Sequence, residues 1–217
     1  MFGLILKDFL VFKKRFNTIY RLIVLIVLAG VVVLFPNEGA HYIALMLPMM
    51  GIAFLAEITK VEEKSDWRDY LPALPITSVE IVLSRYLFCG LLLAVFSVMS
   101  FILCAVSSAL GGFPLSTIMP DYVLGVWLAV LMVCFGIPAG YLYKNEICTG
   151  AMIGCCIIIS IIRNIGLETL FFSHVTAITS FVVLFATILI TYISYKVALW
   201  IFTTKRYRKW LTKPKSI

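Results

Sequence analysis

Six long apolar runs dominate this chain and restrict how it can fold. They cover approximately residues 18–35, 41–59, 80–110, 121–143, 147–163 and 175–203. A helix that crosses a bilayer needs about 20 mainly apolar residues, and the third and sixth runs are longer than that. Only 13% of the residues are charged, whereas about a quarter are charged in globular domains. The sequence therefore predicts an all-α integral membrane protein with six transmembrane helices in a single domain, residues 1–217.

The basic residues fall almost entirely on one side of the predicted bundle. Of the 18 Lys and Arg residues, all except Arg163 lie on the side that holds the N-terminus. By the positive-inside rule, both termini are cytoplasmic, and we expect a multi-pass protein of the plasma membrane. The cations border the apolar runs, so lipid headgroups fit them better as partners than nucleic acid does.

The N-terminal arm, residues 1–17, interleaves apolar and basic side chains. It has no small-residue cleavage site and leads directly into the first run, so we expect it to stay attached. Phe2, Leu6 and Phe9 alternate with Lys7 and Lys13, which is typical of a helix that lies in the headgroup layer. A basic anchor that only orients the first span is an equally good interpretation.

The largest polar segment, residues 60–79, separates the second and third runs. Its apolar residues recur with helical spacing, at Trp67, Tyr70, Leu71 and Leu74. Charged residues back this stripe, at Asp66, Arg68 and Asp69. Thr77 and Glu80 have the spacing of a capping box, which predicts that the third span begins just after Pro75. We therefore expect a short amphipathic helix held between two spans.

A second short segment, residues 163–174, lies on the opposite, outer side. It is too apolar for an ordinary loop and too short to cross the bilayer. Its candidate functional residues are Arg163, Glu168, Leu170, Phe171 and Phe172. A re-entrant helix in the outer mouth of the bundle explains this composition, and so does an aromatic belt at the membrane interface.

Small residues recur at intervals of four within two of the predicted spans. They are Gly136 and Gly140 in the fourth span, and Gly150 and Gly154 in the fifth. Such spacing lets helix backbones approach closely. Packing within the chain is the favoured interpretation, and a dimer seam is the alternative. Pro48 and Pro138 are candidate kink sites.

Motifs for catalysis, metal binding and nucleotide binding are missing. There is no GxxxxGK[ST] phosphate loop, HExxH or GxSxG. The two histidines, His41 and His174, fall at outer span edges, where we expect ordinary polar contacts rather than catalysis. The six cysteines have no CxxC spacing and are expected to pack as small apolar residues. We therefore predict no enzyme activity, metal or cofactor in this chain.

Three acidic residues still need an explanation. Glu62 and Glu63, followed by Arg68, resemble the EExxxR signature of intramembrane CAAX-type proteases, but the arginine is one position late. That family also needs histidines on later spans, and matching ones are not found here. Glu57 lies near the end of the second span, either as a proton or cation site or, preferably, as an interfacial carboxylate paired with Lys60 or Lys64.

The order of these features resembles the permease subunits of the ABC-2 type exporter family. The similarity is strongest over residues 57–87. The positions that carry it are Asp66, Trp67, Tyr70, Leu74, Pro75, Thr77, Val82, Arg85 and Tyr86.

The resemblance implies a function for each of the two short segments. Residues 60–79 would hold a cytoplasmic coupling helix that binds a separate ATPase subunit, which carries the ATP and Mg. Residues 163–174 would form an outer gate. Two permeases, identical or paralogous, would complete the pathway, and its cargo would be apolar or amphipathic, such as a peptide or antimicrobial compound. A membrane scaffold that recruits a cytoplasmic protein, or a CAAX-type protease, remains the alternative.

Overall fold

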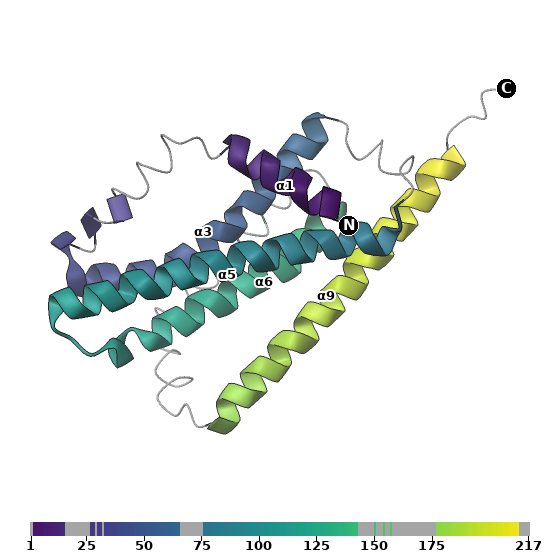
Figure 1. The fold of residues 1–217 in the computed structure, drawn as a ribbon. Helices are drawn as coiled ribbons and strands as arrows, with labels where there is room; N and C mark the ends of the chain where they lie inside the picture. Colours follow the sequence, from purple (N-terminus) through teal and green to yellow (C-terminus); the bar gives the residue numbers. More distant parts are fainter. Residues whose placement is uncertain are drawn as a thin grey trace.

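A computed structural model describes residues 2–15, 27–28, 30–31, 33–65, 76–142, 150, 154, 157 and 177–212. These residues are helical, with no strand among them (Figure 1). The elements are α1 (Phe2–Arg15), α3 (Pro36–Lys64), α5 (Ser78–Gly111), the 3-10 helix η2 (Leu115–Thr117), α6 (Met119–Leu142) and α9 (Ala177–Thr212). The prediction of an all-α protein is confirmed for this part of the chain.

Four of the helices are long and apolar enough to cross a membrane: α3, α5, α6 and α9. They correspond to the second, third, fourth and sixth predicted spans. The other two predicted spans, residues 18–35 and 147–163, lie mostly outside the described residues, so the count of six stays a prediction. At 34 and 36 residues, α5 and α9 are each about 50 Å long, well beyond the ~30 Å hydrocarbon core.

The start of α3 differs from the sequence prediction. We expected this span to begin near residue 41, because Asn37 and Glu38 are polar, whereas α3 begins at Pro36. The early turn is bound to α5, since the Ser107 hydroxyl donates a hydrogen bond to the Pro36 carbonyl at 2.5 Å. The contact with Ser107 of α5 therefore holds a first turn of α3 that lies before the apolar run.

Contacts between the helices fix their directions. The Ser100 hydroxyl donates to the Ile43 carbonyl at 3.1 Å, and with the Ser107 contact this makes α3 and α5 antiparallel. The Ser194 hydroxyl donates to the Cys134 carbonyl at 2.6 Å, while the rings of Tyr141 and Phe202 lie 5.3 Å apart. Hence α6 and α9 run parallel, as expected for two spans separated by one further span.

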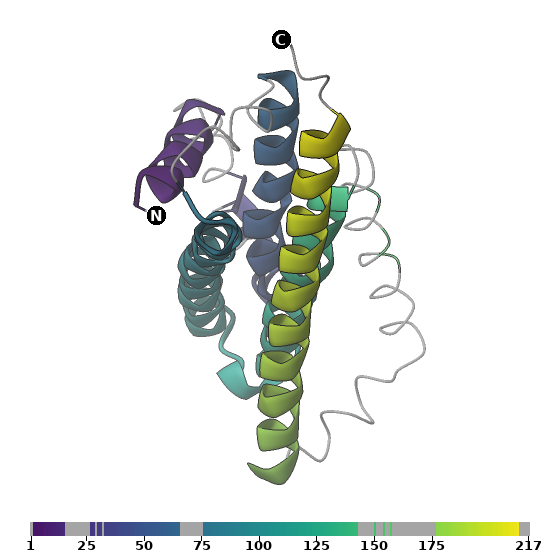
Figure 2. The same ribbon diagram turned by 90° about the vertical axis from the view of Figure 1, so that its right-hand side faces the viewer.

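Different elements lie at the two ends of the bundle. At one end, α1 lies across α3 and α5, close to the C-terminal end of α9 (Figures 1 and 2). We call this the α1 end; α3 and α6 finish there and α5 begins there. At the opposite end, which we call the η2 end, Gly112 adopts the left-handed conformation with φ 66° and closes α5. A glycine adopts that conformation without steric cost.

The main apolar core lies where α3, α5, α6 and α9 meet. Ile52, Val82, Ala129 and Ala198 have no solvent exposure there. By contrast, α5 and α9 each expose a row of large apolar side chains along their outward faces. The exposed residues include Val98, Ile102 and Leu110 on α5, and Phe185, Ile193 and Trp200 on α9. Such apolar surface suits hydrocarbon rather than water.

The predicted capping box starts α5. Glu80 N–H donates to the Thr77 hydroxyl at 3.2 Å, and Thr77 N–H donates to the Glu80 carboxylate at 3.0 Å. This confirms that the third span begins just after the polar segment. Both predicted kink residues, Pro48 and Pro138, lie inside continuous helices.

Candidate functional site

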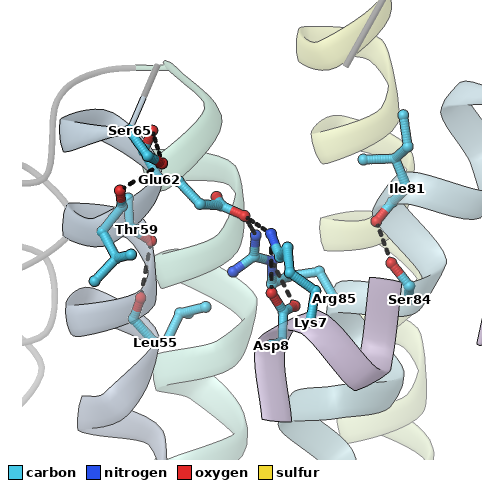
Figure 3. A network of polar contacts seen from close by, with 10 residues as sticks. Lys7, Asp8, Leu55, Thr59, Glu62, Ser65, Ile81, Ser84 and Arg85 are labelled. Carbon is cyan, nitrogen blue, oxygen red and sulfur yellow. Dashed lines mark hydrogen bonds and ion pairs between the residues drawn. The ribbon is translucent and has the colours of Figure 1, made fainter. Parts of the chain in front are cut away.

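Four charged side chains meet at the α1 end of the bundle and form its most distinctive polar feature. Lys7 and Asp8 come from α1, Glu62 from the last turns of α3, and Arg85 from the second turn of α5 (Figure 3). Lys7 Nζ and Arg85 Nη2 both donate to Glu62 Oε1. We call these four residues the charge cluster.

Asp8 completes the charge cluster. Its carboxylate lies 3.1 Å from Lys7 Nζ and 3.6 Å from Arg85 Nε. The cluster therefore joins three helices and balances two cations with two carboxylates. Asp8, Glu62 and Arg85 are only 2%, 7% and 8% exposed. At such burial the loss of one partner leaves an uncompensated charge, which is strongly destabilising.

The spacing of residues along α1 explains why Asp8 points into the charge cluster. Leu4, Asp8 and Phe12 follow each other at intervals of four, so they share one face of the helix. Leu4 packs near Ile81 of α5, and the ring of Phe12 lies 4.9 Å from that of Phe54 on α3. Apolar contacts on either side thus hold Asp8 against Arg85. The outward face carries exposed apolar and basic residues, as a helix at a membrane interface requires; they include Phe2, Leu6, Phe9, Lys13 and Lys14.

A small cavity of about 10 Å³ adjoins the charge cluster. Its walls include Thr59 and Glu62 of α3, Arg85 of α5, and Gly140 and Tyr141 of α6. Arg85 and Tyr141 both line this cavity with buried polar groups. A volume of this size matches one water molecule. The charge cluster therefore adjoins a fourth helix, α6, across this small cavity.

A second ion pair lies at the η2 end. His41 Nδ1 of α3 contacts Asp121 Oδ2 in the first turn of α6. This agrees with the expectation that His41 is a satisfied polar residue at an outer span edge. His174 lies outside the described residues. Searching the ranges that the structure covers, we find no group of three His, Cys, Asp or Glu side chains that could hold a metal ion.

The remaining predicted polar and cysteine residues have ordinary surroundings. Glu57 is about half exposed and lies 3.9 Å from Lys60 Nζ, which supports the interfacial interpretation. Cys89, Cys104 and Cys134 are buried, as expected of small packing residues. The other three cysteines lie outside the described residues.

Both segments that were expected to carry function lie largely or wholly outside the described residues. The first group comprises Asp66, Trp67, Arg68, Asp69, Tyr70, Leu71 and Leu74. The second comprises Arg163, Glu168, Leu170, Phe171 and Phe172. The roles assigned to both groups stay predictions. What the structure adds is the base of the polar segment, because Glu62 near its start and Arg85 just beyond its end are bonded to each other.

The four predicted packing glycines occupy different environments. Gly136 and Gly140 are buried in α6, and a Cβ on Gly140 would meet Thr59 of α3 at 3.7 Å, an ordinary contact. Near Gly150 and Gly154, no atom of the described residues lies within 4 Å of a Cβ position.

Among the glycines that the structure describes, Gly125 makes the tightest contact with a neighbouring helix, and sequence reasoning missed it. A Cβ on Gly125 of α6 would lie 2.5 Å from the Ala44 carbonyl oxygen of α3. Gly125 and Ala129 are four residues apart, as are Ala40 and Ala44. The small-residue spacing that drew attention to Gly136 and Gly140 was thus present here as well.

Asp8 was also missed as a site residue. The available signal was a charged residue in the middle of the apolar face of an amphipathic helix, which predicts a buried partner of opposite charge. Arg85 was noted for its place in a sequence pattern, and Glu62 for a protease-like signature. Their mutual contact depends on how α3 and α5 pair.

These features define a multi-helix membrane protein with a charged junction between an N-terminal amphipathic helix and two of its spans. The chain matches the family model described as "ABC-2 family transporter protein" over residues 3–203. It therefore belongs to this family and is a transmembrane permease of an ABC transporter. Neither a search of curated proteins nor a search of solved structures gave a match.

Proposed function

We propose that this chain is the membrane half of an ATP-driven exporter whose polar segment, residues 60–79, binds a separate ATPase subunit in the cytoplasm. One observation carries the proposal: Glu62 near the start of this segment and Arg85 just beyond its end are bonded to each other and to α1. A force applied to the segment therefore acts on α3 and α5 together. Family membership supplies the expectation of an ABC ATPase partner.

The proposed mechanism requires no chemistry from the permease. ATP and Mg are bound by the ATPase subunits, and their closure moves the coupling helix predicted at residues 66–74. Because the charge cluster joins α1, α3 and α5, these helices tilt as one body. The tilt shifts the population between a cytoplasm-open state and a closed or outward-open state. Residues 163–174 serve as the outer gate in this scheme.

An apolar or amphipathic cargo, such as a peptide or antimicrobial compound, fits the described spans best. In α3, α5 and α6 the charged side chains lie near the helix ends, at the charge cluster, at Glu57 and Lys60, and at Asp121. A strongly polar cargo would leave the long middle sections of these spans without matching groups. A second permease, identical or paralogous, completes the pathway in this proposal.

The orientation follows from the arrangement of the ends. The α1 end holds the basic face of α1, the base of the polar segment and the C-terminal end of α9 (Figure 2). By the positive-inside rule, this end faces the cytoplasm. The membrane in this proposal is the plasma membrane.

The test is co-expression with a phosphate-loop ATPase encoded beside this chain, followed by co-purification and ATPase assays in vesicles. We expect the permease to stimulate ATP hydrolysis. Trp67→Ala should weaken the association about 30-fold, because an aromatic anchor often contributes about 2 kcal/mol. Trp200→Ala is the matched control, since Trp200 lies exposed on α9. Full association and stimulation by the Trp67 variant would contradict the docking role.

The same assays separate the alternatives. A scaffold would bind its cytoplasmic partner without stimulating ATP hydrolysis. An intramembrane protease would lose its activity when Glu62 or Glu63 is changed alone, without any effect on an ATPase. The ion pairs of Glu62 with Lys7 and Arg85 favour a structural role for this carboxylate.

A further inference from the structure

A groove of about 500 Å³ runs between α5, α6 and α9 on the surface of the bundle. Its walls are almost entirely apolar. They include Leu87, Gly90 and Leu93 of α5, Val130 of α6, and Ile188 and Tyr192 of α9. Leu87, Ile188 and Tyr192 are about half exposed on the rim. Because all three helices are candidate membrane spans, the groove lies along the part of the surface that would contact lipid.

The groove has a defined depth in the membrane. At its α1 end the ring of Tyr86 packs 5.8 Å from that of Tyr195, and Tyr86 follows Arg85 of the charge cluster. On α5 this level is next to the charge cluster, whereas on α9 it lies within the candidate span Phe185–Thr204. From Tyr195 the groove extends along α9 to Thr187, which is about 12 Å at 1.5 Å per residue. That length fits within one leaflet, since half the hydrocarbon core is about 15 Å.

A glycine creates part of this space. A Cβ placed on Gly90 would meet no described atom within 4 Å, so this glycine does not serve a close approach of the described helices. Glycine in a helix interior is destabilising relative to alanine. At Gly90 the missing side chain instead widens the groove where it passes α5.

A cation stands at the α1 end of the groove. Lys196 is exposed on α9, and its Nζ lies 5.4 Å from the centroid of the Tyr192 ring that lines the groove. It belongs to a span, Phe185–Thr204, where an ammonium group needs an anion or water. The structure gives Lys196 no carboxylate within 4.0 Å among the residues it describes.

We propose that this groove binds an anionic phospholipid of the leaflet at the α1 end, with one acyl chain between α5 and α9 and its phosphate on Lys196. The apolar walls match the acyl chain, and the Lys196 ammonium beside Tyr192 matches the headgroup. A second copy of this chain is the less suitable occupant, because an apolar helix packed here would leave Lys196 without a counter-charge. The site is independent of the proposed coupling to an ATPase.

Native mass spectrometry of the purified full-length protein tests the site. The probes are 1-palmitoyl-2-oleoyl phosphatidylglycerol and the phosphatidylcholine with the same chains, each added to protein in detergent. The wild type should retain phosphatidylglycerol in preference to phosphatidylcholine. Gly90→Leu places a side chain in the groove and should weaken phosphatidylglycerol binding at least about tenfold, since each excluded methylene contributes to lipid affinity. Gly90→Ala, which adds one methyl group, should bind nearly as the wild type does.

Lys196→Gln tests the headgroup contact separately. It should lower the preference for phosphatidylglycerol over phosphatidylcholine about fivefold, the contribution of one basic residue at an anionic surface, while Lys196→Arg retains the preference. Lys14→Gln on α1 is the control for an exposed cation elsewhere at the same end. Wild-type binding by Gly90→Leu, or an unchanged headgroup preference in Lys196→Gln, would overturn the proposal. Loss of a dimer from Gly90→Leu with lipid binding unchanged would overturn it as well.

Discussion

Arg85 Nη2 donates a hydrogen bond to Glu62 Oε1 across 23 positions of sequence, so the end of α3 is tied directly to the start of α5. Glu62 lies near the start of the polar segment that is proposed to bind an ATPase, and Arg85 lies just beyond its end. Asp8 and Lys7 bring α1 into the same junction. A flexible hinge at this point would absorb movement of the segment, whereas a buried and charge-balanced junction transmits it to the spans.

Removal of Arg85 should strongly destabilise the protein. In Arg85→Met, the carboxylates of Asp8 and Glu62 share only the cation of Lys7, so one buried charge is uncompensated. We expect the free energy of unfolding to fall by about 3–5 kcal/mol. Denaturant unfolding of the purified protein in mixed micelles measures this loss.

The matched control for this prediction is the double variant Glu62→Leu with Arg85→Met. It leaves Lys7 and Asp8, 3.1 Å apart, as a balanced pair, and should recover most of the stability lost in Arg85→Met. The double-mutant cycle then gives the coupling between Glu62 and Arg85. A double variant as unstable as Arg85→Met would show that the ion pair does not stabilise the junction.

Gly125 should tolerate no larger side chain. A Cβ there would lie 2.5 Å from the Ala44 carbonyl and 2.8 Å from the Leu45 carbonyl, and backbone atoms cannot move aside as a flexible side chain can. Gly125→Ala is therefore expected to cost about 2–3 kcal/mol by forcing α3 and α6 apart. Gly140→Ala is the control on the same helix pair, because its Cβ meets Thr59 at an ordinary 3.7 Å. Equal unfolding free energies for both variants would contradict the predicted close approach.

The span positions could largely be predicted from sequence, because apolar length and caps are local properties. The runs near 80–110 and 121–143 correspond to α5 and α6 within about two residues, and Thr77 with Glu80 gave the start of α5 correctly. The start of α3 was wrong, since Pro36 and its neighbours become helical through the contact with Ser107. Such a contact depends on which helices pair, and a single sequence does not give that.

The charge cluster could be predicted only in part, for the same reason. Asp8 is conspicuous on the apolar face of α1, so a buried partner could be inferred, but its identity could not. Glu62 and Glu63 are equivalent in a sequence pattern, and the direction in which Glu62 points is set by the pairing of α3 with α5. Likewise, Gly125 and Gly140 each have a small residue four positions away. Their contacts with α3 distinguish them, because a Cβ would lie 2.5 Å from the Ala44 carbonyl oxygen at Gly125 and 3.7 Å from Thr59 at Gly140.

Loss of the capping box should loosen the start of α5. The Thr77 hydroxyl accepts the hydrogen bond of Glu80 N–H, and Thr77→Ala removes that acceptor. We expect a loss of about 1 kcal/mol in the free energy of unfolding. Hydrogen exchange should also accelerate at the first amides of α5, whose protection is local. Thr77→Ser keeps the hydroxyl and should resemble the wild type; equal exchange in both variants would argue against a role for the cap.

The pair of His41 and Asp121 should stabilise the η2 end of the bundle independently of the charge cluster. It joins the second turn of α3 to the first turn of α6, and both side chains are mostly buried. Asp121→Ala leaves the His41 ring nitrogen without its partner and should cost about 1–3 kcal/mol. Asp121→Asn retains an oxygen acceptor and should cost less. A double-mutant cycle with His41→Ala isolates the interaction between His41 and Asp121. When Asp121→Ala is combined with Arg85→Met, the losses of unfolding free energy should be additive, because the two sites lie at opposite ends of the bundle. Non-additive losses would show that the two ends are energetically coupled.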